Sequence, residues 1–219
     1  MGTKNATRLA EGNGNVNDFL RFCGIVDAAF FGTTNRLIAF AEALASGNCT
    51  LLQYRNKSGN ARVILKQARE LKKHLGDSVR LIMNDRADLC LAADFDGVHV
   101  GQDDLSPESV RRIIGPHRWL GVSTHNPEQL READLTSADY LAIGPVFATS
   151  SKERPDPVVG LEGVRRARKL TRKPLVAIGG ITRANAKSVI DAGADSVAVI
   201  SDLLREPRKS AEEFFRILG

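Results

Sequence analysis

Aromatic side chains are scarce in this chain: Phe, Tyr and Trp together make up 5% of its 219 residues. An all-β sandwich usually draws much of its core from aromatic packing, so this scarcity argues against that class. Hydrophobic residues still reach 42% and charged residues 26%, which is ordinary for a globular domain. Leu, Ile, Val and Ala supply most of the apolar content, which favours an α/β protein with parallel strands.

Cysteine is also rare. Cys23, Cys49 and Cys90 lie far apart among apolar residues, and the sequence contains no Cys-x-x-Cys or Cys/His metal-binding spacing. This pattern predicts buried free thiols in a reducing compartment, and therefore a cytoplasmic protein.

Long apolar runs are absent, which leaves no candidate for a membrane span. The N-terminal stretch has no apolar segment of the kind found in signal peptides. Residues 1–17 are rich in Gly, Asn and charge, and we expect them to form a disordered lead-in. Residues 18–219 should form one catalytic domain, because no linker-like stretch divides them.

The chain is basic, with a formal net charge of +5 and a pI of about 9.3. The basic residues are scattered, and a run such as "RRARKLTRK" (165–173) is typical of a solvated helix face. We therefore expect no nucleic-acid partner. Small phosphorylated molecules fit better, since a positive surface raises their local concentration.

Short β-rich runs alternate with helical patterns from residue 20 onward. Strict alternation implies right-handed crossovers and a parallel sheet, and eight such units close most naturally into a single (β/α)8 TIM barrel. The expected strands are 21–26, 49–54, 79–83, 97–100, 119–123, 140–144, 174–179 and 196–200. The expected helices are 36–46, 60–76, 106–115, 126–133, 160–170, 182–193 and 210–218.

An open doubly wound sheet is the rival architecture. It usually carries a glycine-rich phosphate loop after its first strand. Here the first strand is followed by "DAAFFGTTN", which contains neither GxGxxG nor GxxxxGK[ST]. The sequence therefore favours the barrel, in which function collects in the loops after the strands.

The stretch "TLLQYRNK" (50–57) ends the second expected strand. Alternate side chains share a face, so Leu51, Gln53, Arg55 and Lys57 should point the same way. A solvated strand exit would also account for the two cations. The parity that points Leu51 inward, however, directs the cations to the barrel mouth, where they would need an anion.

Carboxylates follow the next two strands, in "MNDRAD" (83–88) and "GQDDL" (101–105). Taken alone, Asn84 and Asp85 would most simply cap a helix, and "GQDD" would be a turn. Beside a cationic strand end, the two acidic clusters suit Mg²⁺, which takes one or two carboxylates and completes its shell with water and phosphate oxygens. His99 is expected to be a core or second-layer histidine.

The fifth and sixth strand ends offer hydroxyls. Ser123 ends the fifth strand, where a capping role is the alternative. The loop 144–163 is the longest interruption, and its polar stretch 149–152 could be a lid over a site or a plain surface excursion.

The seventh and eighth strand ends, "AIGGIT" and "VISDLL", occupy the usual phosphate-binding position of a barrel. Two anion sites at one end, one of them suited to Mg²⁺ and a diphosphate, suggest displacement of pyrophosphate by a second phosphorylated substrate.

Six blocks resemble one family when they are taken together and in order. They are "TLLQYRNK", "MNDRADLCLAADFDGVHVGQDDL", "LGVSTH", "ADYLAIGPVFATSSK", "VAIGGIT" and "GADSVAVIS". From about residue 22 to the end, the chain is similar to thiamine phosphate synthases. The resemblance implies a transferase (EC 2.5.1.3 type) that joins a pyrimidine-methyl diphosphate to a thiazole phosphate, or to its carboxylate, and releases pyrophosphate. The sequence leaves open whether the thiazole substrate is carboxylated.

The resemblance also implies site residues. The pyrimidine diphosphate would be held by Gln53, Arg55, Lys57, Asn84, Ser123 and Lys152, of which Arg55, Ser123 and Lys152 would act in catalysis. Asp85 and Asp104 would bind Mg²⁺. The thiazole phosphate would be held by Thr149, Ser151, Gly180, Ile200 and Ser201. The family's mechanism is dissociative, so the diphosphate leaves before the thiazole nitrogen attacks.

Two positions depart from the family pattern: Ser151 stands where a threonine is usual, and Asn56 where an acid is frequent. Ser151 keeps a hydroxyl, and Asn56 should alternate away from the site. A related thiazole tautomerase shares the fold but has no need of the diphosphate and Mg²⁺ residues. A non-catalytic phosphate- or nucleic-acid-binding barrel would have no need of carboxylates beside its cations. The sequence leaves open whether the chain is a monomer or a homo-oligomer.

Overall fold

The computed structural model describes residues 21–149 and 156–218. The expected lead-in at 1–17 lies outside these residues, as does part of the loop after the sixth strand. The extent of the domain, 18–219, therefore stays a prediction.

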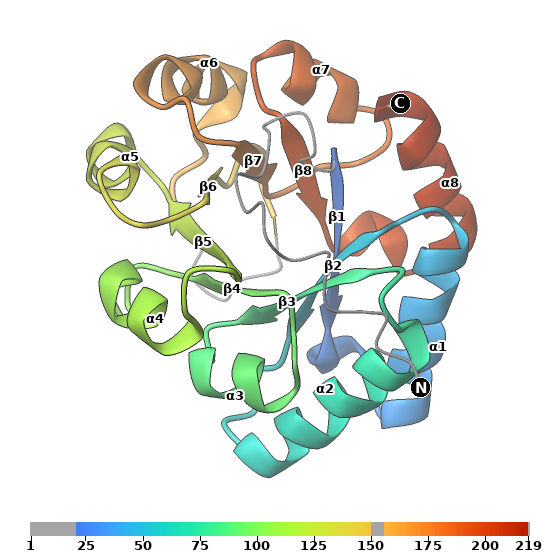
Figure 1. The fold of residues 1–219 in the computed structure, drawn as a ribbon. Coiled ribbons are helices and arrows are strands. Elements are labelled where there is room, and N and C mark those ends of the chain that lie inside the picture. The colour runs from blue at the N-terminus through green and yellow to red at the C-terminus, as the bar shows by residue number, and fades with distance from the viewer. Residues whose placement is uncertain (1–20, 150–155, 219) are drawn as a thin grey trace, which may run out of the picture.

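Eight parallel strands close into a barrel in sequence order, with β8 pairing back to β1 (Figure 1). The sequence prediction of a (β/α)8 barrel is thus confirmed, and each expected strand overlaps an observed one. The strands are β1 (Phe22–Asp27), β2 (Leu51–Arg55), β3 (Arg80–Asn84), β4 (Gly97–Val100), β5 (Trp119–Thr124), β6 (Tyr140–Ile143), β7 (Leu175–Ile178) and β8 (Ser196–Val199).

A ring of helices surrounds the barrel (Figure 1). They are α1 (Thr34–Ser46), α2 (Ala61–Leu75), α3 (Ala87–Ala92), α4 (Pro107–Ile114), α5 (Pro127–Asp134), α6 (Gly160–Leu170), α7 (Ala186–Asp191) and α8 (Pro207–Leu218). Two 3₁₀ turns, η2 (Ala28–Phe30) and η3 (Ser201–Leu203), follow β1 and β8.

The helix predictions were incomplete at α3, which has only six residues. Such a helix is shorter than the window in which a 3.6-residue period can be recognised, so the pattern did not reveal it. At α4 the predicted start is confirmed, because the Ser106 side chain accepts a hydrogen bond from Ser109 N–H and Pro107 occupies the first turn.

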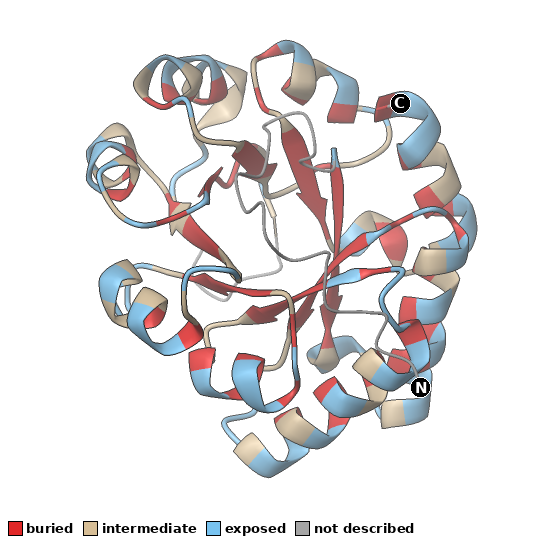
Figure 2. Cartoon of the chain, in the orientation of Figure 1, coloured by how far each residue is buried: buried red, intermediate tan, exposed pale blue. Residues whose placement is uncertain are grey.

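Burial follows strand alternation. One face of the strands packs against the helices, whose outer faces are exposed (Figure 2). The other face fills the barrel interior with a smaller cluster, made of Cys23, Ile25, Leu51, Ile82, Tyr140, Ala142, Val176 and Ala198. Tyr54 points outward, as predicted, and its hydroxyl donates to Gln67 Oε1 at 2.6 Å. Asn56 turns away from the interior too and donates to the same oxygen at 2.9 Å.

The amino-terminal end of the barrel is tied together by a repeated contact. Asp96, Asp139 and Asp195 each precede an even-numbered strand and accept the backbone N–H of Leu81, Leu120 and Leu175, at 2.7–2.8 Å. The repeat reads in the sequence as Asp before "GVHV", "YLAI" and "SVAV". Each aspartate therefore links neighbouring strands at the end where they begin.

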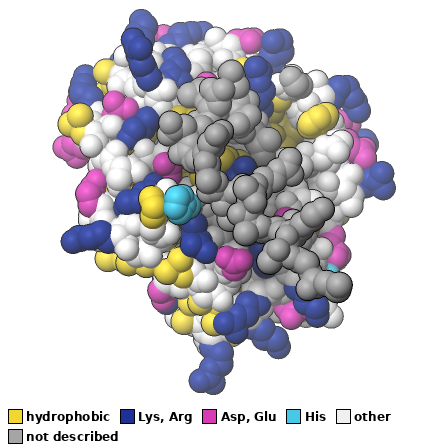
Figure 3. Space-filling model, viewed as in Figure 1, with side chains coloured by type: hydrophobic (Ala, Val, Ile, Leu, Met, Phe, Trp, Pro, Cys, Tyr) yellow, Lys and Arg dark blue, Asp and Glu magenta, His cyan; other side chains and the backbone are white. Residues whose placement is uncertain are grey.

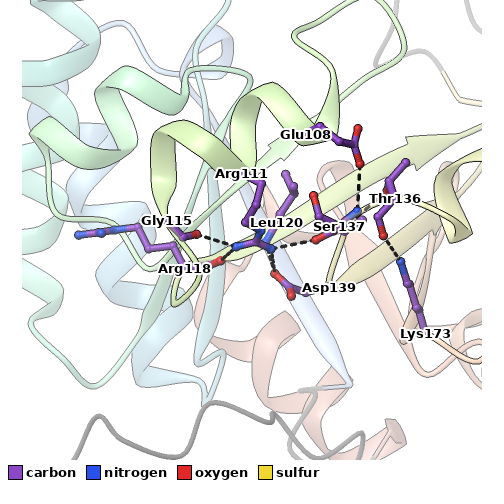
Figure 4. Close-up of polar contacts among 10 residues, drawn as sticks. Glu108, Arg111, Gly115, Arg118, Leu120, Thr136, Ser137, Asp139 and Lys173 are labelled. Atoms are coloured by element: carbon purple, nitrogen blue, oxygen red, sulfur yellow. Dashed lines mark hydrogen bonds and ion pairs between the residues drawn. The ribbon is translucent and has the colours of Figure 1, made fainter.

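Arg111 extends this network (Figure 4). Its guanidinium donates to Asp139 Oδ2 at 2.6 Å and to the carbonyls of Gly115, Arg118 and Ser137 at 2.7–3.0 Å. One side chain of α4 thus satisfies three loop carbonyls and one carboxylate, which holds the loops before β5 and β6 in place.

The three cysteines are free and buried, as the sequence predicted. Burial raises the pKa of Cys49 and of Cys90 to about 12. These thiols are therefore protonated at neutral pH and are poor nucleophiles. Across residues 21–149 and 156–218, we find no helix with the length and apolarity needed to span a membrane.

Candidate active site

A cavity occupies the carboxyl-terminal half of the barrel. Eight of the residues that the sequence singled out line it: Gln53, Arg55, Asn84, Ser123, Thr149, Gly180, Ile200 and Ser201. Ser151 and Lys152 lie outside the described residues, so their placement stays a prediction.

The polar face of β2 enters this cavity. Leu51 belongs to the barrel interior, and Gln53 and Arg55 line the cavity above it, as strand parity predicted. The Lys57 ammonium lies beyond the strand end and pairs with Asp85 Oδ2 at 2.5 Å. The two cations therefore do reach the mouth of the barrel from one strand.

Asp27 is a charged residue of this end that sequence reasoning missed. The residue is 3% exposed, and its carboxylate pairs through Oδ2 with Arg55 Nη1 and accepts Ala29 N–H through Oδ1 at 3.0 Å. It ends β1 with the same parity as Ile25, so the first strand end held a signal that could have revealed it. Asp27 anchors one side of the Arg55 guanidinium.

Two carboxylates stand at the next strand ends. Asp85 has a left-handed backbone, with φ of 62°, and its N–H donates to His99 O at 2.8 Å. Asp104 closes the turn after β4 by accepting Gly101 N–H at 2.7 Å, so "GQDD" is indeed a turn. The capping alternative for Asn84 and Asp85 was wrong, because α3 begins after Arg86 and has no side-chain cap.

The surroundings of Asp85 raise the pKa of its carboxyl group. Burial raises the pKa of Asp85, the Lys57 ammonium opposes this shift, and the neighbouring Asp104 carboxylate adds to it. The net direction is upward, so the ionised form of Asp85 is held in an environment that disfavours it.

A divalent cation with few protein ligands fits the pair. Within the described parts of the chain, no cluster of three or more His, Cys, Asp or Glu side chains could form a metal cage. Asp85 and Asp104 supply hard oxygen ligands from neighbouring strand ends, and the remaining positions would fall to water and to ligand phosphate oxygens. That division is typical of Mg²⁺.

The β7 end supplies a backbone cradle. Gly179 and Gly180 have φ values of 101° and 63°, and a Cβ at position 180 would lie 2.5 Å from Ala148 O. Only glycine is accommodated there, and its backbone can approach a ligand closely. Arg183 supports the cradle by donating to Asp202 Oδ2 and Glu213 Oε2, at 2.9 and 2.5 Å. Hydrogen bonding to Asp202 and Glu213 raises the pKa of Arg183, which keeps it charged.

His99 lines the cavity, and each of its ring nitrogens contacts a hydroxyl. Its Nε2 lies 2.8 Å from Ser123 Oγ and its Nδ1 lies 3.0 Å from Tyr140 Oη. Burial lowers the pKa of His99 to about 4, so the ring is neutral at pH 7. The expectation of a second-layer residue fits this geometry, while Tyr140 was not identified from the sequence.

The cavity walls below these polar groups are apolar. Ile25, Ala142, Val176 and Ala198 face it from β1, β6, β7 and β8. The small side chains at positions 142 and 198 leave space that larger residues would fill in a solid barrel core. An uncharged ring can therefore bind below an anionic group that stays at the mouth.

Fold and site together define a class: a (β/α)8 barrel whose carboxyl-terminal end combines a cation-plus-carboxylate cluster with two adjacent glycines of left-handed backbone. A family model described as thiamine monophosphate synthase matches residues 22–203. The chain belongs to this family.

Individual relatives carry the same family name. The chain is 63% identical to the thiamine-phosphate synthase of Koribacter versatilis, over 90% of this chain and 95% of that protein. It is 46% identical to that of Chloroflexus aurantiacus, over 74% of this chain and 76% of that protein. Among solved structures, thiamine phosphate pyrophosphorylase from Pyrococcus furiosus superposes with a TM-score of 0.82 at 31% identity, over 93% of this chain and 98% of that one.

Proposed function

We propose that the chain transfers a pyrimidine-methyl group from its diphosphate to the ring nitrogen of a thiazole phosphate, with release of pyrophosphate and formation of thiamine phosphate. The observation that supports this proposal is the arrangement of charge and glycine at the carboxyl-terminal end of the barrel. Arg55 lines the cavity, Lys57 pairs with Asp85 beyond the end of β2, and Gly179 and Gly180 line the cavity from the end of β7. We assign the diphosphate to the first group, together with Asp104, and the thiazole phosphate to the second. Family membership supports the same activity.

Each side chain has a role in this reaction. Arg55, Lys57 and Lys152 neutralise the diphosphate, Gln53 and Asn84 contact the pyrimidine, and Ser123 donates to the leaving group. Thr149, Ser151, Gly180, Ile200 and Ser201 hold the thiazole phosphate. Asp85 and Asp104 would hold Mg²⁺, which would supply additional positive charge to the diphosphate oxygens when bound.

The bond changes are simple. The carbon–oxygen bond between the pyrimidine methylene and the diphosphate breaks, and its electron pair leaves with pyrophosphate. The lone pair of the thiazole nitrogen then forms the new carbon–nitrogen bond. Because negative charge develops on the leaving group, prepositioned cations and hydrogen-bond donors are the main catalytic resource, and no nucleophilic side chain takes part.

The apolar cavity walls support a dissociative course. A pyrimidine-methyl cation needs protection from water between departure of pyrophosphate and attack by the thiazole. Below Gln53, Ile25, Ala142 and Val176 present an apolar surface that offers water no hydrogen-bonding partner.

We further propose that the enzyme acts in the cytoplasm on small phosphorylated substrates. The buried, unoxidised thiols support a reducing compartment. Among the described residues on the face seen in Figure 3, Lys and Arg side chains are dispersed and interleaved with Asp and Glu, which is unlike the basic stripe of a nucleic-acid-binding surface.

The test is to incubate the chain with both phosphorylated substrates, with and without Mg²⁺, and to assay pyrophosphate and thiamine phosphate. We expect stoichiometric formation of both products, dependent on Mg²⁺. An isomerised thiazole phosphate without pyrophosphate release would instead indicate the tautomerase reaction. Absence of both reactions would overturn the proposal and favour a binding protein.

A further inference from the structure

Three neighbouring strands place His99, Gly121 and Tyr140 in one layer of the barrel wall. The register pairs His99 of β4 with Gly121 of β5, and Gly121 with Tyr140 of β6. Side chains of β4 and β6 would normally be separated by the β5 side chain between them. Here they meet, with Nδ1 and Oη 3.0 Å apart.

Gly121 is the reason that they meet. A Cβ at this position would lie 2.1 Å from Tyr140 Cζ and 2.4 Å from His99 Nδ1, far inside any permitted contact. The space that a β5 side chain would occupy is filled by the phenol and the imidazole. The contact is therefore built into the barrel by one missing side chain.

The two rings are also held from outside the contact. Their centroids lie 5.4 Å apart, and Trp119 packs edge-on against Tyr140 at 6.5 Å. At the other end, the Ser123 carbonyl accepts a hydrogen bond from Gln102 Nε2 at 2.6 Å. Ser123 Oγ thus lies at the cavity surface with its backbone fixed and with His99 Nε2 at 2.8 Å.

The direction of these hydrogen bonds decides what Ser123 can do. If His99 carries its proton on Nδ1, Nε2 accepts the Ser123 proton and the hydroxyl has no proton left for a ligand. If the proton is on Nε2, that N–H donates to Oγ, and the hydroxyl can donate outward. Only the second arrangement suits an anion in the cavity.

Resting on the function proposed above, we propose that Tyr140 is a positioning residue: its hydroxyl donates to His99 Nδ1, which keeps the proton on Nε2 and turns the Ser123 hydroxyl toward the departing diphosphate. Tyr140 donates to His99, His99 donates to Ser123, and Ser123 donates to a diphosphate oxygen. It is assembled from three strands and ends on the anion whose charge grows during the reaction.

The test compares Tyr140→Phe with Tyr54→Phe, a change at the other tyrosine of the chain, which faces outward and donates to Gln67. We expect Tyr140→Phe to lower kcat/KM for the pyrimidine diphosphate about tenfold, the usual effect of one hydrogen bond, with KM for the thiazole phosphate unchanged. Tyr54→Phe should leave both constants unchanged. In a Ser123→Ala background, Tyr140→Phe should cause no further loss, because its effect passes through that hydroxyl.

A second measurement observes the His99 tautomer directly, without an activity assay. ¹⁵N NMR of histidine-labelled wild-type protein should show neutral His99 with its proton on Nε2, and Tyr140→Phe should shift it toward Nδ1. A proton on Nδ1 in the wild type, or an equal tenfold loss in the Ser123→Ala background, would overturn the inference. A wild-type chain that forms no thiamine phosphate would overturn the proposed function instead, while the NMR tautomer would still decide the relay.

Discussion

The two ends of the barrel use charge in opposite ways. At the amino-terminal end, Arg111 faces Asp139 and three carbonyls, so each group has a complementary partner (Figure 4). At the carboxyl-terminal end, burial raises the pKa of Asp85, the neighbouring Asp104 carboxylate adds to this shift, and Asp85 adopts a left-handed backbone. The contacts at the first end stabilise the fold, and the charged groups at the second end are placed to bind a ligand.

The comparison also separates two uses of aspartate in one fold. Asp139 and Asp195, before their strands, accept strand N–H groups and face arginines, which are fixed contacts within the chain. Asp27, the last residue of β1, and Asp85, the first residue after β3, pair with Arg55 and Lys57, two cations that can also contact an anion. Position relative to the strand, and not residue type, decides the role.

The largest effect should come from Asp85→Asn. Without this carboxylate the cation site is incomplete, and we expect kcat/KM to fall about 10³-fold, or about 4 kcal/mol of barrier. The free energy of unfolding should stay the same or rise at neutral pH, because burial raises the pKa of Asp85 and the ionised carboxylate is disfavoured in the native state. Steady-state kinetics and thermal unfolding measure the two quantities. Asp103→Asn, one residue from Asp104 and exposed, is the control; equal losses in both variants would refute the metal assignment.

Arg55→Ala should follow, with a loss of about 100-fold in kcat/KM for the pyrimidine diphosphate, the scale of a charge-assisted hydrogen bond. KM for the thiazole phosphate should change little, because that ligand binds at the β7 and β8 ends. Buried Asp27 also loses its cation, so unfolding must be monitored alongside the kinetics. Equal losses for both substrates would refute the assignment of Arg55 to the diphosphate site.

Arg111→Ala tests the contacts at the amino-terminal end of the barrel. We expect a loss of about 2 kcal/mol in the free energy of unfolding, because three carbonyls and Asp139 lose a donor. The melting temperature should fall by about 4–8 °C. Activity below that temperature should be unchanged. The control is Arg112→Ala, at an exposed neighbour whose guanidinium donates to Ser109 Oγ at 3.2 Å; it should change stability by less than about 0.5 kcal/mol. A drop in kcat in Arg111→Ala would show that the two ends are coupled.

Mg²⁺ should produce the smallest effect. Binding to the native state at about five times the dissociation constant adds about 1 kcal/mol of stability, or about 2–4 °C. Asp104→Asn should remove this increment while its side-chain oxygen can still accept Gly101 N–H. Calorimetry with and without Mg²⁺ measures the shift, and a variant that keeps the full increment would exclude Asp104 as a ligand.

Much of the fold and part of the site could be read from the chain. Eight short apolar runs that alternate with helical patterns were enough to predict the barrel. The alternation of side chains along the second strand correctly placed Gln53 and Arg55 in its interior. Helix α3 was missed because six residues carry too little periodicity. Asp27 and Tyr140 were missed for another reason: their meaning depends on Arg55 and His99, which are 28 and 41 positions away.

The sequence by itself determined the architecture and the residue types at most strand ends, because period-2 alternation and strict strand–helix order are local properties. Only the tertiary structure decided which strand ends became partners and at what height in the barrel. Gly121 illustrates the difference. In the chain it is one glycine in "LGVS", and in the closed barrel its missing Cβ is the space in which Tyr140 reaches His99. Such a contact depends on the register of three strands at once, which no local pattern specifies.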